Sequence, residues 1–152
     1  MDAVTSQALA ALRDAVAQLI PSASSGGVER RTTALPVRIA PVGIGGLVVS
    51  RTEPTASIFG RRIEADVRAV FTGGSASARE TFAGETLTNV LSISAGSLRD
   101  AGFLRIKPDA EQAGDVGAQD RIVRLKVKFE FIATPVVGEG VIEEIPTRTE
   151  IG

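Results

Sequence analysis

The sequence predicts an α+β domain, with helices on one face of a mostly antiparallel β-sheet. Two observations lead to this prediction. Within residues 61–71 and 121–131, apolar and charged side chains alternate over 62–69 and over 123–131, the pattern of a strand with one buried face. Residues 3–20 and 78–91 instead place apolar side chains at helical spacing. The chain therefore offers two half-buried strands and two amphipathic helices that can cover them.

Length and charge limit the possible classes of protein. A chain of 152 residues has the length of one ordinary domain. Its net charge of -1 gives no overall attraction to nucleic acid or to an anionic membrane. No apolar run approaches the roughly 20 residues that span a bilayer, and Asp2 stands where a secretion signal carries positive charge. We therefore expect a soluble protein that is made and kept in the cytosol.

The missing residue types argue against catalysis. Without cysteine the chain has no disulfide and no thiolate metal site, and without histidine it lacks the side chain that most readily carries protons near neutral pH. Tryptophan and tyrosine are also absent. We expect a protein that is not an enzyme and that needs no cofactor or metal.

The predicted helix over residues 3–20 comes first in the chain and ends at Pro21. Residues 22–34 are rich in Ser and Gly and turn basic at Arg30 and Arg31, which predicts a flexible connection. Prolines cannot donate hydrogen bonds inside a sheet, so Pro36 and Pro41 predict only an edge segment at 37–39. A short strand at 47–50 and a long turn over 51–60 are predicted to follow. The apolar stripe of the helix comprises Leu9, Leu12, Val16, Leu19 and Ile20.

A capping box predicts the second helix, over residues 78–91. Ser77 and Glu80 have the spacing at which each side chain satisfies one backbone donor at a helix start. This helix and the N-terminal helix should pack on the apolar side of strand 61–71. Its inner stripe comprises Phe82, Thr86, Leu87, Val90 and Leu91.

The rest of the chain is predicted to hold two strands and a long end. Ser97 predicts one helical turn before Gly102, a strand follows at 103–107, and a polar loop precedes strand 121–131. Residues 133–152 keep several apolar side chains, so we expect an extended C-terminal arm that docks on another surface.

The charged sides of the two alternating strands complement each other in part. If these strands are neighbours, Glu64 and Asp66 stand across from Arg124, Lys126 or Lys128. If they are not, the charges form stripes that face water or a neighbouring subunit. The basic side chains could also follow a phosphate backbone, but the phenylalanines of the same strand alternate onto the buried side.

Several stretches resemble ligand sites and depart from each motif. The glycines at 43–46 precede a predicted strand where a nucleotide loop needs a helix, and the turn 73–75 lacks the lysine of a phosphate loop. The pairs Glu64 with Asp66 and Glu143 with Glu144 lack a pocket that would separate their pKa values. A calcium-like spacing, with alanine at one ligand position, is formed by Asp109, Glu111, Gly114, Asp115 and Asp120.

The order of elements resembles that of the tail terminator proteins of tailed phages and of phage-tail-like contractile injection particles. The resemblance covers about residues 3–132 and includes the stretches GRRIEADVRAVF, SARETFAGETLTNVL, FLRIK and RIVRLKVKFEF. It implies a structural virion subunit that forms a hexameric ring, caps the tail tube and, in contractile tails, the sheath, and connects to the neck. It also implies assembly in the bacterial host, with genomic DNA passing through the ring without specific binding. The alternatives are another neck, baseplate or tube-associated protein, or a monomeric calcium- or anion-binding module.

Unfinished sheet edges and an apolar chain end also favour association between subunits. Added strands gain affinity from main-chain hydrogen bonds, and a ring is the closed form of a head-to-tail interface. We therefore expect an interface formed by copies of the chain. We expect no membrane partner. The expected interface residues are Arg62, Glu64, Asp66, Arg68, Arg124, Lys126, Lys128, Val141, Ile142, Ile145 and Ile151.

Overall fold

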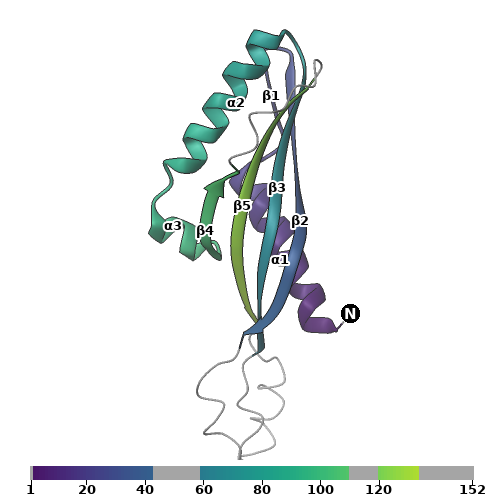
Figure 1. Ribbon diagram of the computed structural model, residues 1–152, viewed down its shortest axis with the longest axis vertical. Helices are drawn as coiled ribbons and strands as arrows, with labels where there is room; N and C mark the ends of the chain where they lie inside the picture. Colours follow the sequence, from purple (N-terminus) through teal and green to yellow (C-terminus); the bar gives the residue numbers. More distant parts are fainter. Residues whose placement is uncertain (1, 43–58, 110–119, 134–152) are drawn as a thin grey trace, which may run out of the picture.

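The computed structural model describes residues 2–42, 59–109 and 120–133. These residues form an α+β fold, as predicted, with an antiparallel five-stranded sheet in the order β1-β2-β3-β5-β4 (Figure 1). The elements in chain order are α1 (Ala3–Leu19), β1 (Ala23–Ser25), β2 (Val28–Val42), β3 (Phe59–Gly73), α2 (Ala76–Leu91), α3 (Ala95–Asp100), β4 (Phe103–Pro108) and β5 (Asp120–Ala133).

The central strand β3 is the predicted strand 61–71 with two more residues at each end. It pairs with β2 on one side and with β5 on the other, so its backbone hydrogen bonds are satisfied within the sheet. Ile63, Val67 and Phe71 on its apolar side are fully buried. The strict alternation of the sequence is therefore confirmed as one buried and one polar face.

Helices α1 and α2 cover the buried face, as predicted. Leu12 and Val16 of α1 and Phe82 of α2 belong to the same apolar core as the inner residues of β3 and β5. Phe82 meets Phe71 edge to face, with the ring centroids 5.2 Å apart. Phe129 of β5 packs edge to face on Phe103 of β4, which closes the core at that edge of the sheet.

The predicted flexible connection over residues 22–34 is wrong, because this segment is a β-hairpin. Gly26 and Gly27 both have positive φ, +60° and +82°, and they join β1 to β2 as a two-residue turn between Ser25 and Val28. Two left-handed residues in a row define the turn type whose twist matches a hairpin, and glycine adopts it without strain. Beyond the turn, the basic part of the segment lies within the paired length of β2.

The prediction of an edge strand around Val37 is confirmed, but the strand is much longer than predicted. β1 pairs with β2 only as far as Arg30. From Arg31 to Val42 the outer side of β2 has no partner strand among the described residues, and both prolines of the strand lie in this part. The register shifts by one residue between Pro36 and Arg38, which marks a β-bulge at Val37.

Two predicted helix caps are corrected. The N-cap of α2 is Ser75, whose hydroxyl accepts a hydrogen bond from Ala78 N at 3.0 Å, so the capping box at Ser77 is wrong. The short helix α3 begins after Ser94, which accepts from Ser97 N at 3.1 Å. In both places the N-cap lies closer to the N-terminus than predicted. Ser75 and Ser94 are each the last residue with extended backbone angles before the helix.

Some predictions fall outside the described residues. These are the glycines at 43–46, the strand at 47–50, most of the turn 51–60, the interior of the calcium-like loop and the C-terminal arm.

Candidate functional site

The side of the sheet opposite α1 and α2 is polar, and we call it the open face. No described element packs on it. On β3 it carries Arg62, Glu64, Asp66 and Arg68, of which Asp66 is half-buried and the others are exposed. These are four of the predicted interface residues, and they share one face because alternate residues of a strand point the same way.

Pairing between β3 and β5 brings the predicted opposite charges together. Glu64 stands directly across from Lys128, and Asp66 stands across from Lys126. Both pairings confirm the expectation that the alternating strands are neighbours. Within the described ranges, however, the ion pair that forms between these strands joins Arg62 to Glu130, at 2.7 Å.

Strand β4 adds more positive charge at the edge of the open face. Arg105 stands across from Lys128, and Lys107 stands across from Lys126. Like charges directly across two strands are destabilising. We call these four residues the basic quartet, and none of them forms an ion pair or a hydrogen bond through its side chain with another described residue.

The quartet was not foreseen from the sequence. Arg105 and Lys107 were assigned to a strand, but no pattern in the chain gives the register in which that strand meets β5. The register also shifts between Phe103 and Arg105, which leaves Leu104 as an extra, partly exposed residue.

On its other side, the open face becomes apolar. Leu35 of β2 stands across from Asp66, and the side chains of Leu35 and Val37 are 55% and 64% exposed. Val37, the two carboxylates of β3 and the basic quartet line a shallow depression of about 450 Å³. Asp109, just after β4, adds a third carboxylate to its rim.

The depression is lined mostly by charged side chains of both signs. Among residues 2–42, 59–109 and 120–133, no group of three acidic side chains is placed to hold a metal ion. Glu64 is exposed and Asp66 is half-buried, and both lie among cations. What this face can offer a partner is charge, exposed aliphatic surface and a free strand edge.

The turn at Gly73 and Gly74 is a structural cap. Ser75 uses its hydroxyl for Ala78 N, and Arg79 Nη1 donates to the carbonyl oxygens of Gly73 and Gly74 at 2.9 and 3.0 Å. The turn needs glycine because Gly73 and Gly74 both have positive φ, +83° and +60°.

Two buried-face arginines were missed as structural anchors. Arg30 Nε and Nη2 donate to the carbonyl oxygen of Pro21, and Nη1 donates to Thr86 Oγ1 at 2.9 Å. Its guanidinium lies 5.0 Å from the centroid of the Phe82 ring. Burial lowers the pKa of the Arg30 guanidinium, which nevertheless stays charged. Arg30 therefore ties β2 to the end of α1 and to α2.

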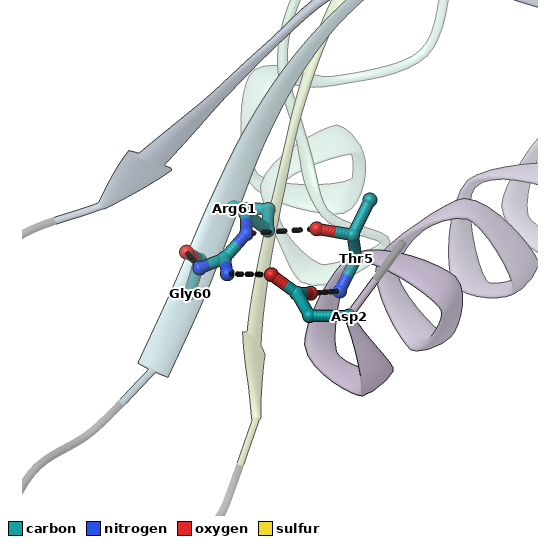
Figure 2. Close-up of polar contacts among 4 residues, drawn as sticks. All are labelled: Asp2, Thr5, Gly60 and Arg61. Carbon is teal, nitrogen blue, oxygen red and sulfur yellow. Dashed lines mark hydrogen bonds and ion pairs between the residues drawn. The ribbon is translucent and has the colours of Figure 1, made fainter.

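Arg61 anchors the other end of α1 to the sheet (Figure 2). Its Nη2 lies 3.0 Å from Asp2 Oδ2, and its Nε donates to Thr5 Oγ1 at 3.1 Å. Asp2 is also the N-cap of α1 and accepts from Thr5 N at 2.6 Å. Hydrogen bonding by Thr5, and then by Arg61, lowers the pKa of the Asp2 carboxyl to about 2.

Within the described part of the chain, no helix is long and apolar enough to span a membrane. Comparisons of the chain with protein-family models, with curated proteins and with solved structures found no match.

Proposed function

We propose that this chain is a structural subunit that assembles with copies of itself. The observation that supports this most directly is a sheet face that no described element covers, beside an edge of β2 that no described strand pairs and where Leu35 and Val37 are exposed. Exposed apolar residues along an unpaired edge strand favour pairing with another chain. In monomeric proteins such edges are usually short, charged or covered.

The more specific proposal is a tail terminator of a tailed phage or tail-like particle. It draws on the resemblance of the sequence over about residues 3–132, and the described elements follow the order helix, three strands, two helices and two strands. In this role a hexameric ring caps the tail tube and connects it to the neck. Another neck, baseplate or tube-associated subunit would use the same open face and edge.

The test is the mass of the protein in solution, measured by light scattering over a range of concentrations, together with electron microscopy. A discrete multimer with ring-shaped particles is the expected result. A monomer at every concentration, with no recruitment to a tail tube, would overturn the proposal.

A monomeric calcium- or anion-binding module makes a different prediction. Its melting temperature would rise when calcium or phosphate is added, because a ligand that binds only the folded state stabilises it. For the proposed assembly subunit, the melting temperature should instead rise with protein concentration.

A further inference from the structure

We propose that the basic quartet, with Leu35 and Val37 beside it, is the docking surface for the C-terminal segment 134–152 of a neighbouring copy. The inference rests on the proposed self-assembly and adds which surface and which segment meet.

The open face has an excess of positive charge where the quartet lies. Two rows of side chains cross the sheet there. One row runs Arg38, Glu64, Lys128 and Arg105, and the other runs Leu35, Asp66, Lys126 and Lys107. Five cations thus stand against two carboxylates in the rows, and Asp109 adds a third nearby. An acidic partner would relieve the repulsion between the cations of β4 and β5.

The C-terminal segment has complementary chemistry. Residues 134–152 contain four glutamates and one arginine, so the segment is acidic although the whole chain is nearly neutral. Within it, residues 141–145 read Val-Ile-Glu-Glu-Ile, which joins three aliphatic side chains to two carboxylates. The open face has the same two chemistries in the same order, from aliphatic on β2 to basic on β4 and β5.

The dimensions of sheet and segment agree. Neighbouring strands lie about 4.8 Å apart, so β2 and β4 are separated by about 14 Å across the sheet. An extended chain rises about 3.3 Å per residue, so five residues cover nearly the same distance. An extended segment that places Ile142 over Leu35 and Val37 would put Glu144, whose side chain points the same way, about 7 Å further on toward the cations of β5.

The segment also begins in a suitable place. It follows Ala133, the last residue of β5, at the end of the sheet where the paired lengths of β2 and β3 also end (Figure 1). A chain that continues from this end of one subunit can reach the sheet of the next.

Nucleic acid is a weaker candidate for the same surface. Glu64 and Asp66 stand on β3 between β2 and the quartet, where they would repel a phosphate backbone that crosses the whole face. The aromatic side chain nearest to the rows, Phe129, lies on the buried side of β5, so no base can stack on it.

A charge exchange tests the proposal on the full-length protein. The acceptor variant is Arg105→Glu with Lys107→Glu, which replaces two like-charge pairs by opposite-charge pairs and should leave the fold at least as stable. The donor variant is Glu143→Lys with Glu144→Lys. A control with the same change of charge as the donor is Asp14→Lys with Glu85→Lys, at exposed positions on α1 and α2.

We expect the acceptor and donor variants each to weaken self-association by roughly tenfold or more, as judged from mass against concentration. Combining all four substitutions should restore association, and the control should match the wild type. Mixing the acceptor variant with the donor variant should also produce mixed multimers, because the exchanged charges then meet between chains.

Other outcomes separate this inference from the proposed function. If the wild type assembles and neither charge variant weakens it, the docking surface is wrong while self-assembly stands. A combined variant that fails to recover, or mixed variants that stay apart, would also refute the pairing between chains. If the wild type never assembles, both proposals fail. Binding of double-stranded DNA that the acceptor variant loses, with assembly unchanged, would assign the quartet to nucleic acid instead.

Discussion

The two sides of β3 differ sharply although their residues alternate along one strand. Val67 and Phe71 are fully buried beneath α1 and α2, whereas Arg68 between them is exposed on the open face. The covered side supplies apolar burial, the main favourable term in folding. The open side supplies charges in register, which contribute little to the stability of a single chain. Substitutions on neighbouring residues should therefore have very different effects.

The largest effect is expected for Phe71→Ala. This change removes a fully buried ring that packs edge to face on Phe82, and it should lower the free energy of unfolding by about 3–5 kcal/mol. Arg68→Ala, three residues away on the open face, should change it by less than about 0.5 kcal/mol. Urea denaturation of both variants makes the comparison. Equal losses would contradict the division between the faces.

Arg30 and Arg31 provide a matched pair on opposite faces. Arg30→Ala removes the contacts with Pro21, Thr86 and the ring of Phe82, and should cost about 2 kcal/mol of unfolding free energy. Arg31 is exposed, and its pair with Glu29 at 3.9 Å is exposed on both sides, so Arg31→Ala should cost about 0–0.5 kcal/mol. Chemical denaturation measures the unfolding free energy of both variants. A larger loss of unfolding free energy for Arg31→Ala than for Arg30→Ala would contradict the role of Arg30 as the structural anchor.

Replacement by valine should stabilise the fold more at Thr32 than at Thr33. The hydroxyl of Thr32 is buried and has no hydrogen-bond partner among the described residues, so Thr32→Val removes an unsatisfied polar group and should stabilise the fold by about 1 kcal/mol. Thr33 lies on the open face and is exposed. Thr33→Val shares the change in strand propensity without that gain. The difference between the two melting temperatures measures the effect, and no difference would show that Thr32 Oγ1 finds a partner.

The smallest effect is a pH dependence at Asp2. Its pKa is lowered from an ordinary value of 3.8 to about 2 in the folded protein. The stabilisation from the ionised carboxylate is thus present above about pH 4 and is lost as the pH falls toward 2. Asp2→Asn should destabilise the protein at pH 6 and less so at pH 2.

Denaturation at both pH values measures this change. Asp14→Asn, on the same helix and outside the contacts of Arg61, is the control. A loss for Asp2→Asn that is the same at both pH values would contradict the role of the charge.

The sequence was most informative where periodicity reports burial. Alternation within 61–71 and 121–131 predicted β3 and β5, and two of the three basic residues expected as partners, Lys128 and Lys126, stand across from Glu64 and Asp66. This worked because each strand has one buried side, so a shift of one residue would turn charged side chains into the core. The amphipathic stripe of α1 was equally clear for the same reason.

Prediction failed where local geometry decides. The Gly-Gly pair at 26–27 carried a hairpin signal, but its Ser-rich surroundings suggested a linker. Ser75 and Ser77 are chemically identical candidates for one cap, and only the backbone of the preceding turn distinguishes them. The basic quartet depends on the register between β4 and β5, which no side-chain pattern in the short, partly exposed strand β4 encodes.

The bulge at Val37 reverses which residues of β2, odd-numbered or even-numbered, face the helices. Before it, Ala34 and Pro36 face the helices; after it, Ile39 takes that side and Arg38 turns outward to stand across from Glu64. If Val37 instead paired regularly with Glu64, Arg38 would stand across from Ile63 and its guanidinium would point toward the interior. One inserted position thus keeps two halves of a long strand compatible with a single sheet, and an alignment with a chain that lacks it would need a gap at this point.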